Sequence, residues 1–64
     1  MTNNAQQVID FMRSNPNGKK SFEPLDLKPL NLSDKALESA LEELESKNLI
    51  EYHTEWIAPT IKLL

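Results

Sequence analysis

The first part of the chain places apolar side chains at helical spacing, which predicts a helix that buries one side. Asn3 or Asn4 can cap this helix, because a short polar side chain accepts the free amide hydrogens of the first turn. Pro16 ends it, since the residue before a proline avoids helical geometry. Gly18, the only glycine, suits the turn that follows because it adopts positive φ readily. The apolar positions are Ala5, Val8, Ile9 and Met12, with Phe11 at their border.

A second apolar stripe, again with helical spacing, predicts a longer helix in the second half of the chain. Ser33 caps this helix, and Asn48 can end it in the left-handed conformation. The β-branched and aromatic residues that follow predict two strands joined by a very short tip, His53-Thr-Glu55. The apolar positions are Leu37, Ala40, Leu41 and Leu44 in the helix, and Leu49, Ile50, Tyr52, Trp56, Ile57 and Ile61 in the hairpin.

The segment between the two stripes is rich in proline and leucine. Pro24 excludes a central strand there but permits a short edge strand or an extended link from Phe22 to Leu25. Asp26 can cap a short second helix that runs from Leu27 to about Leu30, with these two leucines buried. Pro29 then falls in the first turn, where its missing amide hydrogen costs little.

The predicted fold class is therefore α+β, mainly helical, in a single domain over residues 1–64, with three helices followed by a short C-terminal β-hairpin. Its most distinctive residues are Leu27 in the second helix, the cap Ser33, the stripe Leu41-Glu-Glu-Leu44 and the exit Asn48-Leu-Ile50. This pattern, which covers roughly residues 5–64, resembles the winged helix-turn-helix superfamily. The resemblance implies a small domain that acts by binding.

Charge is distributed unevenly along the chain. The net charge of -3 excludes a generic basic nucleic-acid coat protein. Residues 13–35 carry five cations and three anions, a balance of +2, whereas residues 36–64 carry two cations and six anions, a balance of -4. This asymmetry indicates either ordinary surface charge or two different contact surfaces.

Composition argues against catalysis and against bound cofactors or metals. His53 is the only histidine and is expected in an exposed hairpin tip, which argues against a serine–histidine catalytic site. One histidine and no cysteine cannot make a zinc site without several carboxylates. A chain of this size also has a thin core. No apolar run approaches the ~20 residues of a membrane span. Residues 1–4 contain neither a basic region nor an apolar stretch, so we expect no secretory signal and a cytoplasmic location.

One functional hypothesis is a sequence-specific DNA-binding transcriptional regulator. The resemblance implies that the third helix is then the recognition helix and enters the major groove. Among the candidate DNA contacts, Lys35 and Ser39 could contact phosphate or a base edge. The others, which could reach phosphates, are Arg13, Lys19, Lys20 and Lys28. Against this hypothesis, Glu38 and Glu42 on the same helix would be repelled by the phosphate backbone.

Contact with a protein partner is the hypothesis that we favour, because members of the superfamily also use the third helix and the hairpin in this way. Aromatic side chains would anchor such an interface. The candidate contacts are Glu38, Glu42, Glu45, Tyr52 and Trp56. Phe22 is also suited to anchor an interface, but these aromatic residues, Trp56 above all, can instead belong to the core. The apolar ending Ile61-Lys-Leu-Leu64 either completes the sheet or pairs with a second copy in a homodimer.

Overall fold

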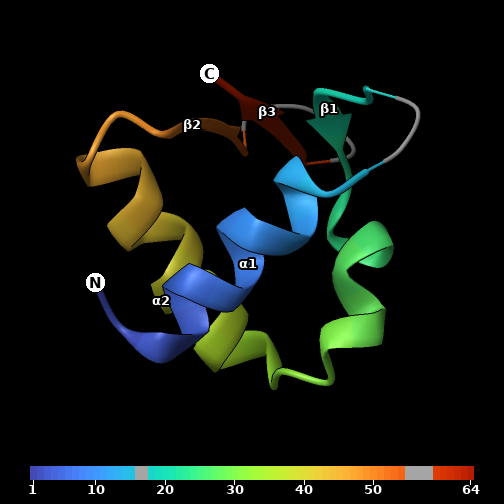
Figure 1. The fold of residues 1–64 in the computed structure, drawn as a ribbon. Coiled ribbons are helices and arrows are strands. Elements are labelled where there is room, and N and C mark those ends of the chain that lie inside the picture. The colour runs from blue at the N-terminus through green and yellow to red at the C-terminus, as the bar shows by residue number, and fades with distance from the viewer. Residues whose placement is uncertain (16–17, 55–58) are drawn as a thin grey trace.

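The computed structural model describes residues 1–15, 18–54 and 59–64 and shows an α+β fold, as predicted (Figure 1). Its helical segments are α1 (Asn3–Arg13), the 3₁₀ helix η1 (Pro24–Leu30) and α2 (Asp34–Ser46). Its strands are β1 (Ser21–Phe22), β2 (Ile50–His53) and β3 (Thr60–Leu63). Pro16, and the expected tip and strand residues Glu55, Trp56 and Ile57, lie outside the described residues.

The strands of the described ranges form one antiparallel sheet in the order β1-β3-β2. Ile61 of the central strand pairs with Phe22 on one side and with Tyr52 on the other. The prediction of three helices followed by a short C-terminal hairpin was therefore incomplete, because β1 also pairs with β3. The prediction for His53 was wrong: its backbone pairs with Thr60, which places it in β2 rather than in a turn.

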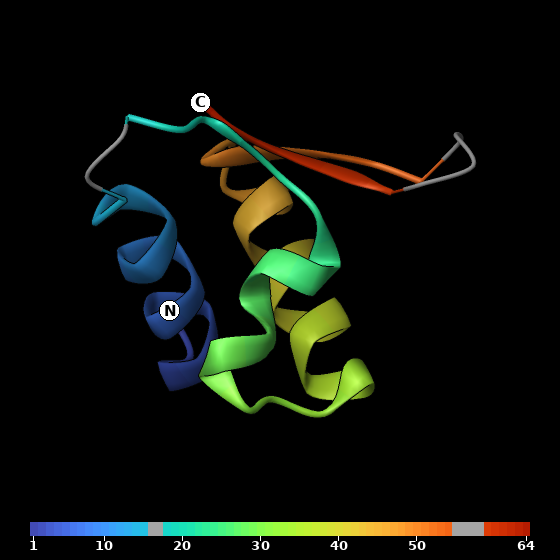
Figure 2. The same cartoon turned by 90° about the vertical axis from the view of Figure 1, so that its right-hand side faces the viewer.

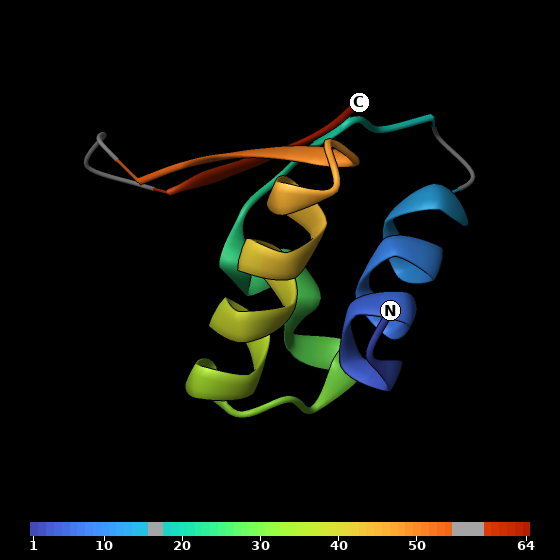
Figure 3. The same cartoon turned by 90° about the vertical axis from the view of Figure 1, so that its left-hand side faces the viewer.

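The apolar stripes of α1 and α2 meet the inner side of the sheet and form the core. Figures 2 and 3 show the sheet lying across one end of the helices, with β2 and β3 extending to one side. The sequence did not decide whether Phe22 is buried; its side chain is 2% exposed and belongs to the core. The buried residues are Ala5, Val8, Ile9, Met12, Phe22, Leu27, Ala40, Leu41, Leu44, Ile50 and Ile61. The predicted partners Leu30 and Leu37 are only partly buried.

The start of α1 differs from the prediction, because Thr2 rather than Asn3 or Asn4 caps the helix. The Thr2 hydroxyl oxygen accepts a hydrogen bond from the amide of Ala5 at 3.3 Å. The Thr2 amide and hydroxyl in turn donate to the Glu43 carboxylate of α2, at 3.0 and 2.9 Å. The Thr2 amide first, and then its hydroxyl, lower the pKa of Glu43. A contact with α2, which is distant in the sequence, therefore favours Thr2 as the cap of α1.

Replacing Glu43 with glutamine should destabilise the protein at neutral pH and have less effect in acid. A carboxyl group whose pKa is lowered by folding stabilises the native state at pH values above its usual pKa of 4.5. That contribution is lost as the pH falls through the lower pKa of the folded state. Thermal unfolding of the unmodified protein and of Glu43→Gln, at pH values from neutral to acid, checks the prediction. The exposed neighbour Glu42 provides the control, as Glu42→Gln. A difference in melting temperature that does not change with pH would contradict the assignment.

The 3₁₀ helix η1 begins earlier than predicted. Glu23 precedes it and Pro24 opens it, in a first-turn position where proline is already set for helical geometry. Asp26 therefore lies in the first turn rather than at the cap, and its carboxylate accepts a hydrogen bond from the Glu23 amide at 2.9 Å. Pro29 lies further inside the helix than expected.

Both ends of α2 are as predicted. The Ser33 hydroxyl accepts a hydrogen bond from the amide of Ala36 at 3.1 Å. At the other end Asn48 has a φ of 61°, and the amide of Leu49 donates to the carbonyl of Leu44 at 3.0 Å. This left-handed termination turns the chain directly into β2 and so fixes where β2 lies relative to α2.

Candidate functional site

The exposed side of α2 carries carboxylates that gather beside Tyr52 of β2. Glu38, Glu42 and Glu45 are exposed and follow one another at helical spacing, so they share one side of α2. Partial burial raises the pKa of the Tyr52 hydroxyl above its usual 10.0, and the negative charges of these glutamates raise it further. We call Glu38, Glu42, Glu45 and Tyr52 the acidic face. It unites the predicted protein contacts except Trp56, which lies outside the described residues.

One member of the acidic face also protects the edge of the sheet. β2 lies at the edge, and the amide of Tyr52 points away from β3, because the hydrogen-bonded pair Leu49–Leu64 sets the alternation along the strand. The Glu45 carboxylate accepts a hydrogen bond from this amide at 3.3 Å. A covered edge amide and a nearby charge both disfavour strand pairing with another chain. The homodimer through this edge stays a prediction, and Glu45 opposes it.

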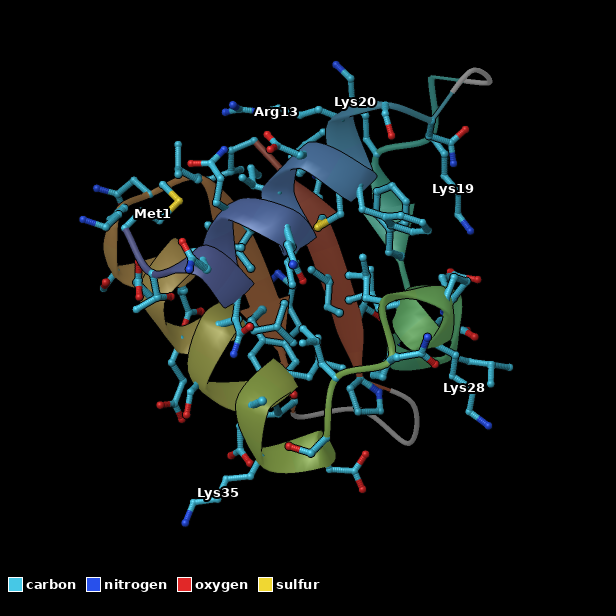
Figure 4. The ribbon with its side chains drawn as sticks, turned by 60° about the horizontal axis from the view of Figure 1, so that its bottom comes forward. Met1, Arg13, Lys19, Lys20, Lys28 and Lys35 are labelled. Carbon is cyan, nitrogen blue, oxygen red and sulfur yellow. The ribbon has the colours of Figure 1, made fainter. Side chains whose placement is uncertain are left out.

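The cations predicted to contact DNA point outward from different sides of the molecule (Figure 4). Lys35, at the start of α2, lies far from Arg13 and Lys20 in this view. Lys19 and Lys28 project from a third side. These five side chains therefore do not form one basic patch.

Lys19 is already engaged within the protein. Its ammonium lies 2.9 Å from the Asp26 carboxylate and 5.3 Å from the centre of the Phe22 ring. The Glu23 amide first, and then Lys19, lower the pKa of Asp26. These contacts hold the segment before β1 against η1. A phosphate would have to compete with Asp26 for Lys19, which makes this lysine a weaker candidate for DNA contact than the sequence indicated.

On α2 itself, cations and hydroxyls are mixed with acids. Lys35 and Ser39 are exposed and lie about one turn apart. Glu38 and Glu42 are exposed along the same part of the helix. A phosphate that approached Lys35 would therefore also approach these carboxylates, whose charge opposes binding.

A groove that the sequence did not indicate runs between η1 and α2. One hollow, of about 210 Å³, is lined by Pro24, Asp34, Leu37, Glu38, Leu41 and Tyr52. A second, of about 200 Å³, is lined by Pro24, Leu25, Leu27, Lys28, Leu32, Asp34 and Leu37. Both hollows share Pro24, Asp34 and Leu37, so they are adjacent, and we call them together the groove. Its first hollow is bordered by the acidic face.

The geometry of η1 explains why apolar surface remains in this groove. A 3₁₀ helix has three residues per turn, so residues three apart lie on the same side. Leu27 and Leu30 therefore share the side that packs toward the core, while Leu25 and Lys28 share another. Leu25 remains 64% exposed. The available signal was the closely spaced leucines of residues 25–32, which are more than one side of a short helix can bury.

Within the described ranges, no group of three or more histidine, aspartate or glutamate side chains is placed to hold a metal ion. His53 Nε2 lies 3.1 Å from the Glu51 carboxylate, as a pair on one strand. Within the described ranges, every helix is too short or too polar to cross a membrane.

The chain matches no protein-family model, no curated protein and no solved structure. Inferences about function therefore depend on its own surfaces. Those surfaces are the acidic face, the dispersed cations and the groove between η1 and α2. Of these, the acidic face and the groove adjoin one another through Glu38 and Tyr52.

Proposed function

We propose that this protein is a small, non-enzymatic winged helix-turn-helix regulatory module of the cytoplasm, which binds a protein partner through α2 and the β2–β3 hairpin. The order α1, β1, η1, α2, β2, β3 supports the fold assignment, because it is the order that the sequence resemblance calls for. The short connection at residues 31–33 places α2 directly after η1, as a helix-turn-helix requires.

The gathering of Glu38, Glu42 and Glu45 around Tyr52 carries this proposal. In a DNA-binding member of the superfamily, the exposed side of this helix would lie close to phosphates. Here that side presents carboxylates, which favour a positively charged protein surface instead. Tyr52 adds an aromatic ring of the kind that often anchors protein interfaces.

A DNA-binding transcriptional regulator is the second candidate. Lys35 and Ser39 support it, because both are exposed on the helix that would enter the major groove. Arg13, Lys20 and Lys28 could add phosphate contacts only from other sides of the molecule, as Figure 4 shows. Such scattered charges neutralise few phosphates at once, and phosphate contacts supply most nonspecific affinity.

Titration of the intact chain with fluorescent random duplex DNA distinguishes the two candidates. Near physiological salt we expect binding weaker than about 10⁻⁴ M, the weak end for ordinary nonspecific binders, because α2 presents more acids than bases. The same titration with Lys35→Ala and Ser39→Ala provides the comparison. Micromolar or tighter binding that these substitutions abolish would make the DNA-binding candidate correct.

A further inference from the structure

We propose that the groove between η1 and α2 binds a basic amphipathic helix of the partner protein. This inference rests on the proposed function and adds the chemistry of the partner. Neither the acidic face alone nor the apolar groove alone would indicate what binds there. The two together indicate a segment that is both apolar and basic, because the first hollow has apolar and acidic lining residues.

The size of the groove favours a side chain over a free small molecule. Each hollow, at about 210 and 200 Å³, is smaller than the ~300–1,000 Å³ typical of small-molecule pockets. Leu37 lines both of them. Two adjacent hollows that share a lining leucine suit two apolar side chains of a bound helix, as in other helix-in-groove complexes.

The exposed apolar side chains of the groove would favour binding of this helix. Leu25 is 64% exposed, and Leu32 and Leu37 are only partly buried. Covering these side chains removes apolar surface from water, which stabilises a complex. Duplex DNA would meet the same leucines with charged phosphates and would leave their burial energy unused.

The charges around the first hollow indicate that the bound segment is positively charged. Asp34 and Glu38 line the first hollow, and Glu42 and Glu45 follow on the same helix outside it. Lys28 lines the second hollow, so the acidic border belongs to the first. Lysines or arginines beside the apolar side chains of the bound helix would face these carboxylates. A second copy of this chain fits less well, because its own net charge is -3 and its α2 carries the same acids. A basic helix from another protein is therefore the occupant.

A displayed library of random peptides, selected on the intact chain, tests this inference. The groove variant is Leu25→Asn, and the matched control is Leu64→Asn, since both leucines are mostly exposed, at 64% and 60%. The charge variant combines Glu38→Gln with Glu42→Gln. Circular dichroism verifies that each variant folds. We expect the selected peptides to be basic amphipathic helices. Their affinity should fall about tenfold or more on Leu25→Asn, as for an interface anchor, but should not change on Leu64→Asn.

The other outcomes separate the two proposals. Peptides that need Glu38 and Glu42 but bind Leu25→Asn as well as the unmodified chain would overturn the groove and leave the acidic face as the binding site. Selected peptides that are acidic or not amphipathic would overturn the proposed occupant. A failure to select any peptide, or peptides that no variant weakens, would overturn both the groove and the proposed function.

Discussion

Replacing Leu41 with alanine is expected to lower the free energy of unfolding by about 2–5 kcal/mol. The Leu41 side chain is 1% exposed and belongs to the core cluster that α1, α2 and the sheet share. Its truncation loses buried apolar surface and leaves a cavity that the surrounding side chains fill only in part. Because small domains have a total stability of about 5–15 kcal/mol, this loss is a large share. Chemical denaturation at equilibrium measures it.

Leu25→Ala is the matched control, since it removes the same atoms from a side chain that is 64% exposed. We expect its stability to change by no more than about 0.5 kcal/mol, as for surface substitutions in general. An equal loss of unfolding free energy in the two variants, or no loss in Leu41→Ala, would show that Leu41 is not a core residue.

The helices could be predicted because their signals are local. Apolar spacing identified the buried sides of α1 and α2, and Ser33 and Asn48 identified both ends of α2 from side chains within one turn. The cap of α1 could not be predicted in this way. Thr2 gains its advantage over Asn3 from Glu43, which is 41 residues away in the sequence. A contact of that kind exists only after the two helices have packed.

The middle segment and the sheet show a different limit. Pro24 was a usable signal for the start of η1, because proline favours the first helical position, but the carboxylate of Asp26 suggested a later start. The role of Leu25 depends on the three-residue turn of η1, which the sequence pattern did not distinguish from an α-helix. His53 was misplaced because strand pairing with Thr60, a non-local property, decides where β2 ends.

For the candidate site, the sequence identified residues but not how they are arranged. It named Glu38, Glu42, Glu45 and Tyr52, and the structure places them together. It also grouped the cations as one set, whereas Figure 4 shows them on separate sides. Helical spacing relates residues within α2, so the first grouping could be predicted. The position of Lys19 or Lys28 relative to Lys35 depends on how η1 packs against α2.

Combining Glu38→Lys with Glu42→Lys is expected to raise the affinity of the protein for random duplex DNA and to steepen its salt dependence. Each reversal adds two positive charges, so the pair takes the net charge from -3 to +1. Both residues are exposed on α2, the helix that carries Lys35, and would then present cations where carboxylates now oppose phosphate. If both new lysines contact phosphates, the slope of log affinity against log salt should become steeper by about 1.8. Fluorescence anisotropy at several salt concentrations measures it.

The same charge change made elsewhere separates a local effect from net charge. Asp10→Lys with Glu51→Lys alters two exposed acids on α1 and β2 by the same amount. We expect this control to gain less DNA affinity, because its new lysines do not extend the surface around Lys35. The α2 variant should also bind more weakly the peptides selected on the unmodified chain, since its lysines repel a basic helix that the glutamates attract. Equal DNA affinity in the two variants would show that α2 is not the side that meets DNA, and would remove the basis for assigning its glutamates an anti-DNA role.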